Sequence, residues 1–239
     1  MTVVVSMWSG PRNISTTMMR AFGNRADARA IDEPFYAYYL ERTGADHPYR
    51  AETLARCPAR FPDVLNRIES AGAGDILFLK QIAYHLEDGV DLSFISGWRN
   101  FLLIRDPRAM VASFSNKHDD AAPIIASYRI AARIHEYLAG QEIPCPILDA
   151  DDILKEPEAV LRALCGALGI PFDTAMLAWD SGPRAEDGPW APHWYDAVRA
   201  STGFRPYVEK KVNLSKELEL LAESAMADYH RLYSRRLLA

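Results

Sequence analysis

Short apolar runs alternate with longer amphipathic stretches along most of this chain. Turn or capping residues bound the runs, which cover Val3–Met7, Ala28–Ile31, Ile76–Leu79, Phe101–Ile104 and, more briefly, Ile147–Leu148. Runs that are apolar on both faces are typical of buried parallel strands, because helices cover both sides of such a sheet. The remaining periodic stretches predict helices over Ser15–Phe22, Ala51–Ser70, Pro107–Phe114, Ala121–Ala139, Glu156–Leu168 and Leu214–Leu237.

Strands that alternate with helices indicate βαβ units, right-handed crossovers and a doubly wound α/β domain. Ligands of such sheets bind beyond the carboxyl ends of the strands, so we expect the functional residues directly after the apolar runs. A length of 239 residues fits a single domain over 1–239.

The segment 181–205 is predicted to be a lid loop over the binding site. Its first part, Ser181–Pro192, is rich in Gly, Pro and charge, and loops of this length in compact domains are often lids. Disorder is the alternative. The aromatic residues Trp190, Trp194 and Tyr195 favour an ordered lid.

The composition narrows the class of protein. Apolar residues make up 49% of the chain and charged residues 25%, which supports a full core, and the net charge of −5 gives no extended nucleic-acid footprint. Three cysteines without a CxxC pair argue against a disulfide framework or a zinc site. The chain start lacks a basic segment, and no apolar run reaches about twenty residues, so neither a signal peptide nor a membrane span is expected. We therefore expect a cytoplasmic protein with no nucleic-acid or membrane partner; its oligomeric state is unknown from sequence.

The first candidate ligand site follows the first apolar run. It consists of Gly10, Pro11, Arg12, Asn13, Ile14, Ser15, Thr16 and Thr17. A strand, a tight turn and a helix N-terminus bind anions, because free N–H groups and the helix dipole point at the ligand, and Arg12 adds a guanidinium. An ordinary helix cap formed by the Ser and Thr hydroxyls is the alternative. The GxxxxGK[ST] pattern lacks its Lys here, so a nucleoside triphosphatase is disfavoured.

The second candidate site follows Phe101–Ile104. Asp106 is predicted to cap a helix that begins at Pro107, which places Arg105 at the strand end and Ser113 on the helix. Arg105 and Ser113 can then face one phosphate. Alternatively, Arg105 pairs with Asp106 or another carboxylate.

Together the two motifs resemble those of PAPS-dependent sulfotransferases (PAPS is 3′-phosphoadenylyl sulfate). The stretch 11–16 is similar to their 5′-phosphosulfate loop, roughly Pro-Lys/Arg-Ser-Gly-Thr-Thr, and 102–113 is similar to their 3′-phosphate motif. The resemblance implies a three-layer α/β/α fold of P-loop NTPase type with a central, mainly parallel sheet. It also implies PAPS as sulfuryl donor, a small-molecule acceptor with a hydroxyl or amine, and no metal. A fainter likeness of 182–190 to the family's lid implies that Arg184 and Gly188 approach the 3′-phosphate.

Three positions depart from the family pattern. Ile14 stands where the family has Gly, so the loop cannot freely adopt positive φ there. Arg12 replaces the commoner Lys and changes the donor geometry. Thr17 stands where an aromatic residue often stacks on adenine.

Two residues are candidates for the general base, which typically contributes about 10²–10⁴-fold to a rate. Glu33 follows the run Ala28–Ile31, in a position similar to the glutamate base of some bacterial sulfotransferases, although Asp32-Glu33 can also be read as a solvated turn. His85 follows Ile76–Leu79 and is the second candidate. Lys80, at the end of that run, either meets the transferring sulfuryl group or is solvated.

The tyrosines Tyr36, Tyr38 and Tyr39 line an acceptor pocket or belong to the core. The sequence thus predicts a PAPS-dependent sulfotransferase. The alternatives are a nucleotide-binding protein of this fold without transfer activity and a small-molecule kinase.

Overall fold

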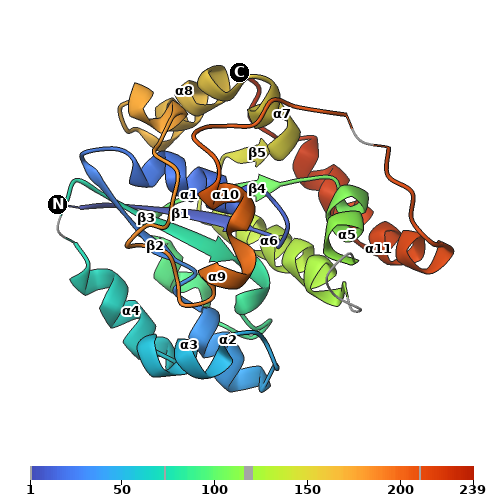
Figure 1. The fold of residues 1–239 in the computed structure, drawn as a ribbon, viewed down its shortest axis with the longest axis horizontal. Coiled ribbons are helices and arrows are strands. Elements are labelled where there is room, and N and C mark those ends of the chain that lie inside the picture. The colour runs from blue at the N-terminus through green and yellow to red at the C-terminus, as the bar shows by residue number, and fades with distance from the viewer. Residues whose placement is uncertain (1, 73, 116–120, 210) are drawn as a thin grey trace.

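The centre of the molecule is a five-stranded parallel sheet in the order β2-β3-β1-β4-β5 (Figure 1). The computed structural model describes residues 2–72, 74–115, 121–209 and 211–239. The strands are β1 (Val3–Ser9), β2 (Ala28–Asp32), β3 (Ile76–Ile82), β4 (Arg99–Ile104) and β5 (Ile147–Asp149). All five predicted strands are confirmed, and each is extended by one to three residues at one or both ends because ladder hydrogen bonds continue past the apolar runs.

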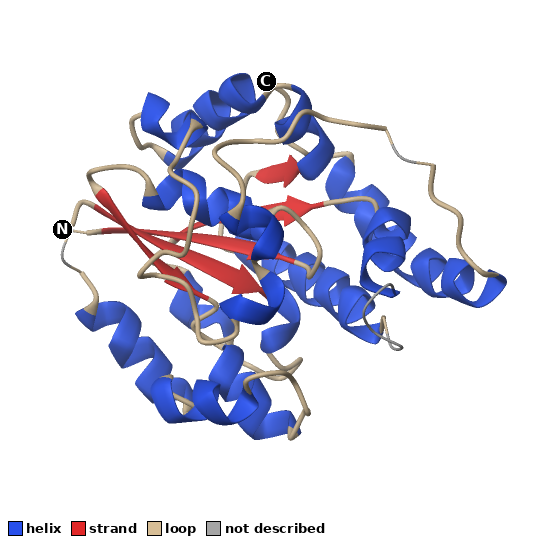
Figure 2. Cartoon of the chain, in the orientation of Figure 1, coloured by secondary structure: helices blue, strands red, loops and turns tan. Residues whose placement is uncertain are grey.

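Helices cover both faces of this sheet (Figure 2). Val5 and Met7 of β1 pack with the layer that contains α1 (Ser15–Gly23) and α8 (Pro157–Leu168). Trp8, on the opposite face, packs with the layer of α4 (Phe61–Ser70), α5 (Pro107–Ser115), α6 (Ala122–Gly140) and α11 (Lys216–Tyr233). The predicted three-layer α/β/α architecture with a parallel central sheet is confirmed.

Shorter helices complete the described chain. They are α2 (Tyr36–Thr43), α3 (Arg50–Arg56), α7 (Ala150–Lys155), α9 (Ala191–Trp194) and α10 (Asp196–Arg199), with the 3₁₀ turns η1 (Ala83–His85), η2 (Leu92–Ile95) and η3 (Thr174–Leu177).

Two of the predicted helices differ from the observed helices by more than one residue at an end. The single helix expected over Ala51–Ser70 is two helices, α3 and α4. Cys57 between them is extended at φ −117° and ψ 145°, as a residue that precedes a proline prefers. The last helix ends at Tyr233 rather than Leu237, because the Leu237 N–H donates to the Ile147 carbonyl and the tail turns back to β5.

The lid segment, residues 181–205, packs on the sheet instead of lying detached from it. It contains α9 and α10, and the side chains of Trp190 and Tyr195 are only 2% and 5% exposed. The segment is therefore folded in this structure and does not match the alternative of a disordered loop. No helix in the described part of the chain is both long and apolar enough to cross a membrane.

Candidate functional site: a cavity at the carboxyl ends of the strands

A cavity of about 810 Å³ opens where β1, β2, β3 and β4 end, covered on one side by the lid segment. Most of the predicted site residues line it: Pro11, Arg12, Asn13, Ile14, Ser15, Thr16, Thr17, Glu33, Lys80, His85, Arg105 and Ser113. The parallel sheet brings them together, because every strand ends at the same edge and each loop begins there.

Three predicted residues do not line this cavity. Gly188 lines a second, smaller cavity instead, and its N–H donates to Asp32 Oδ2 at 3.0 Å. Gly10 lies beneath the loop, where an added Cβ would come within 2.6 Å of the Met110 side chain, so its role is close packing. Arg184 points elsewhere and donates to the Asn24 side-chain oxygen and the Asp180 carbonyl, both at 3.4 Å. The structure therefore does not place Arg184 beside the other cations.

The two phosphate motifs are joined through their arginines. Arg12 Nε donates to Ser113 Oγ at 3.2 Å, and the Arg105 guanidinium donates to the Arg12 carbonyl at 3.0 Å. Asp106 instead caps α5, accepting from the Arg108 N–H at 2.7 Å. The alternative in which Arg105 pairs with Asp106 is therefore wrong.

The guanidinium groups of Arg12 and Arg105 have no carboxylate counterion in the part of the chain that the structure describes. Among the described residues, neither Arg12 nor Arg105 forms an ion pair, and Arg105 Nε is buried without a hydrogen-bond partner. Burial, and next the neighbouring Arg105 charge, lower the pKa of Arg12. Two adjacent unneutralised cations in a partly buried cavity form a site for an anion.

The backbone of the first loop takes an unexpected conformation. Positive φ occurs at Arg12, with φ 58°, while Ile14 has φ −84°. The expected conflict at Ile14 is thus absent, because the left-handed residue lies two positions earlier. Asn13 ties the loop to β4, since its side-chain N–H donates to the Leu103 carbonyl at 2.8 Å.

No side chain caps α1. Its N-cap residue, Ile14, makes no side-chain capping hydrogen bond, and Ser15, Thr16 and Thr17 line the cavity. The ordinary-cap interpretation of these hydroxyls is therefore wrong, and the helix N-terminus faces the cavity beside Arg12.

A buried network lies at the ends of β2 and β3. The parallel register pairs Asp32 with Lys80, and Lys80 Nζ donates to Asp32 at 2.9 Å, to Glu33 at 2.5 Å and to the Tyr195 hydroxyl at 2.5 Å. The side chains of Lys80 and Asp32 are each 1% exposed and that of Glu33 is 11% exposed. Asp32 and Glu33 therefore do not form a solvated turn, and Lys80 is not a solvated lysine.

This network sets the protonation of its members. Burial raises the pKa of Glu33, against the opposing effect of the Lys80 charge. Burial lowers the pKa of Lys80, but Asp32 and Glu33 outweigh it and raise that pKa well above its ordinary value. Lys80 is therefore a fixed cation, and Glu33 is a carboxylate with raised proton affinity at the cavity wall.

His85 is placed behind Glu33. Its Nδ1 lies 3.9 Å from Glu33 Oε2, and its ring stacks on Tyr36 and Tyr39 with centroid distances of 4.8 and 5.1 Å. Burial, followed by the His47 and Lys80 charges, lowers the pKa of His85 well below its ordinary value, so the imidazole is neutral near pH 7. Tyr36 and Tyr39 line the cavity. Tyr38 does not, and its hydroxyl donates to Glu87.

Three lid residues at the site were missed from sequence: Trp190, Tyr195 and Arg205. The Tyr195 hydroxyl donates to Asp32 at 2.7 Å and accepts from Trp190 Nε1 at 3.2 Å. Arg205, rather than Arg184, is the lid arginine on the cavity. The only sequence signal was the density of aromatic and charged residues in 181–205, which does not say which of them turn inward.

The described residues contain no group of three or more His, Cys, Asp and Glu side chains arranged to hold a metal ion.

Comparison with known proteins decides the family. The family model described as "Sulfotransferase domain" matches residues 1–236 of this chain. The chain belongs to the sulfotransferase family. Two solved structures support the fold of this sulfotransferase: the sulfotransferase from Alicyclobacillus acidocaldarius (TM-score 0.60, 12% identity, 100% of this chain and 98% of that chain) and the sulfotransferase domain from the curacin biosynthetic pathway (TM-score 0.57, 14% identity, 100% and 99%).

Two curated relatives of this sulfotransferase come from Arabidopsis thaliana. They are named branched-chain-amino-acid aminotransferase-like proteins 2 and 1, and they are 38% and 37% identical over 202 residues. The matched region is 84% of this chain and 36% of each relative, so the chain spans about a third of their length.

Proposed function

We propose that this sulfotransferase moves a sulfuryl group from PAPS to a hydroxyl or amine of a small-molecule acceptor. The proposal rests on one observation: a single cavity is lined both by cationic groups and by a carboxylate. At one end lie Arg12, Arg105 and Ser113, linked to one another and free of carboxylates among the described residues. At the other end lies Glu33, a buried carboxylate with raised proton affinity.

A ligand with two separated phosphate groups suits the cationic end. Arg12 and the N-terminus of α1 follow β1 in the chain, Arg105 and Ser113 follow β4, and all of them line the one cavity. PAPS carries a 3′-phosphate and a distant 5′-phosphosulfate, so each pair can take one of them. A triphosphate is disfavoured because the loop lacks the P-loop Lys.

In the proposed reaction, Glu33 accepts the proton from the acceptor hydroxyl or amine. A bond forms between the acceptor atom and sulfur, and the bond between sulfur and the 5′-phosphate oxygen breaks. The leaving 3′,5′-adenosine bisphosphate keeps that oxygen and its added negative charge, which Arg12 and the first turn of α1 stabilise electrostatically. Lys80 holds Glu33 in place through the 2.5 Å contact.

Calorimetric titration of 3′,5′-adenosine bisphosphate, ADP and ATP tests the donor. We expect the bisphosphate to bind at least tenfold more tightly than ADP or ATP, since only it carries the 3′-phosphate for Arg105 and Ser113. Absence of bisphosphate binding would reject PAPS as donor. Tighter, magnesium-dependent binding of ATP would support the kinase alternative.

Incubation with PAPS and an acceptor panel tests transfer. Amino acids and amino alcohols belong in the panel beside phenols and alcohols, because the Arabidopsis relatives are named for an amino-acid enzyme. Formation of a sulfated product with release of the bisphosphate supports the proposal. Tight bisphosphate binding without product from any acceptor favours the non-transferring alternative.

A further inference from the structure

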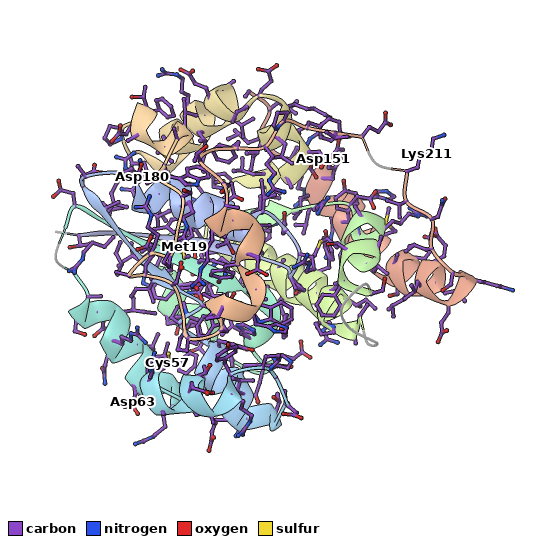
Figure 3. The ribbon with its side chains drawn as sticks, in the orientation of Figure 1. Met19, Cys57, Asp63, Asp151, Asp180 and Lys211 are labelled. Atoms are coloured by element: carbon purple, nitrogen blue, oxygen red, sulfur yellow. The ribbon has the colours of Figure 1, made fainter. Side chains whose placement is uncertain are left out.

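A second cavity, of about 440 Å³, lies outside the first one and is lined by residues of the lid segment and of the helices α3 and α4. Arginines from both sides line it: Arg56 and Arg67 from α3 and α4, and Arg184 and Arg199 from the lid segment. Cys57, labelled in Figure 3, lies between the two helices on the same wall.

The carboxylates on this wall are already engaged by cations from elsewhere. Asp32 contacts Lys80 at 2.9 Å, and Asp187 and Glu186 contact Arg20 at 2.7 and 3.4 Å. Arg20 and Lys80 do not line the second cavity. Each of these carboxylates therefore has a cation partner outside the cavity, although Arg20 is shared by Glu186 and Asp187 and Lys80 is shared by Asp32 and Glu33.

The lining arginines lack matching counterions. Within the described part of the chain, Arg56, Arg67 and Arg184 form no ion pair, and Arg199 meets only Asp187, at 3.4 Å. Arg199 Nε is buried and has no hydrogen-bond partner. A cavity with four guanidinium groups and few free carboxylates has an excess of positive charge that an anion would neutralise.

We propose that this cavity is a second anion site, which takes a small tetrahedral oxyanion of the phosphate or sulfate class. The oxyanion bridges Arg56 and Arg67 on the helices and Arg184 and Arg199 on the lid segment, so it fastens the lid segment to α3 and α4. Guanidinium groups suit such a ligand because each can donate two parallel hydrogen bonds.

The site also adjoins the catalytic cavity. Trp190 lines both cavities, and its Nε1 donates to the Tyr195 hydroxyl that contacts Lys80. Asp32 faces the second cavity and belongs to the same network. An oxyanion that holds the lid segment in place therefore also restricts the motion of the residues that contact Lys80, the partner of Glu33.

Calorimetric titration with inorganic phosphate tests the site, at an ionic strength held constant with sodium chloride. The protein is the Arg105→Ala variant, which weakens the first anion site so that the second is measured. We expect the Arg56→Gln/Arg67→Gln double variant in this background to bind phosphate at least tenfold more weakly. Both residues are exposed, so their replacement leaves the core unchanged. Arg60→Gln is the matched control, since Arg60 is an exposed arginine beside the same helices that does not line the cavity.

Hydrogen exchange of residues 184–199 gives a second readout. Phosphate should slow exchange there in the Arg105→Ala protein and in its Arg60→Gln derivative, and should not in the double variant. Equal phosphate affinity in the double variant and the control, or no binding beyond the effect of chloride, overturns the proposal. The result is independent of the proposed function, which fails only if 3′,5′-adenosine bisphosphate does not bind the wild-type protein or no acceptor is sulfated.

Discussion

Two charged residues that line the cavity at the strand ends have positive φ, which is uncommon for residues other than glycine. Arg12 has φ 58° and Glu33 has φ 40°. Such a conformation costs on the order of 1 kcal/mol and persists only when its surroundings stabilise it. Here the Arg105 hydrogen bond to the Arg12 carbonyl and the Lys80 contact to Glu33 supply that stabilisation. With these strained backbone conformations, the Arg12 guanidinium and the Glu33 carboxylate line the same cavity.

Replacing Arg105 by Ala tests the cationic end. The change removes a charged donor and frees the Arg12 carbonyl, so binding of 3′,5′-adenosine bisphosphate should weaken by about 1.5–3 kcal/mol, or roughly ten- to hundredfold. Calorimetry measures the loss. Arg60→Ala, an exposed arginine away from the cavity, should leave binding unchanged. An unaltered affinity in Arg105→Ala would remove this residue from the donor site.

Replacing Glu33 by Gln tests the base. The amide keeps the shape of the side chain but cannot accept the acceptor's proton, so turnover should fall at least tenfold while bisphosphate affinity stays within a factor of about three. Steady-state kinetics and calorimetry separate the two effects. If turnover survives and His85→Gln abolishes it, His85 is the base instead.

At the scale of elements, the lid segment is attached to the ends of β2 and β3 through the Tyr195 hydroxyl and through the Gly188 N–H, which donates to Asp32 Oδ2 at 3.0 Å. Tyr195, between α9 and α10, contacts Lys80 of β3, Asp32 of β2 and Trp190 of the lid itself. The same segment continues to Arg205, which lines the same cavity as Glu33 and Arg12. The lid segment therefore contributes to the cavity wall and contacts the buried pair of Lys80 and Asp32 beside Glu33.

Tyr195→Phe removes this hydroxyl but keeps the ring. Loss of a buried hydrogen-bonding group should lower the free energy of unfolding by about 1–2 kcal/mol, and the looser Lys80–Glu33 pair should reduce kcat more than donor affinity. Chemical denaturation and steady-state kinetics measure these changes. Tyr207→Phe is the matched control, because that ring contacts Lys155 outside the cavity. Equal behaviour of the two variants would contradict the role given to Tyr195.

At the scale of the whole molecule, one buried carboxylate makes stability depend on pH. Asp149 ends β5 and caps α7, accepting from the Asp151 N–H at 2.9 Å, and its side chain is buried. Burial first, and next the charges of Asp151 and Asp152, raise the pKa of Asp149 to about 6. Between pH of about 4 and 6 the Asp149 carboxyl of the folded protein therefore binds a proton that the unfolded chain has released, and the contribution of this group to the free energy of unfolding falls as pH rises through this window.

Asp149→Asn should abolish most of this dependence, since the amide keeps the capping oxygen but does not titrate. The wild type should lose on the order of 1–3 kcal/mol of stability between pH 4 and 6 from this group, and the variant should lose correspondingly less. Denaturant titrations at several pH values measure the slope. Parallel profiles for the two proteins would show that Asp149 does not cause it.

The sequence by itself determined the strands and the order in which they alternate with helices. Runs such as Val3–Met7 and Phe101–Ile104 must be buried on both faces, and only a covered parallel sheet satisfies that requirement. The phosphate motifs were also predictable. Arg12 and Arg105 lie in loops that leave the carboxyl ends of strands, and in a parallel sheet these loops share one edge. Pro58 was a local signal for the break between α3 and α4, because a residue that precedes a proline disfavours the helical conformation, but the apolar periodicity on both sides favoured a single helix.

Only the tertiary structure decided how the lid meets the sheet. Asp32 and Lys80 are 48 residues apart, and they pair because β2 and β3 are neighbours in register. Tyr195, 115 residues beyond Lys80, contacts that pair, and Arg205 rather than Arg184 lines the cavity. Contacts between distant segments depend on the path of the connecting chain, which short-range hydrophobic periodicity does not encode.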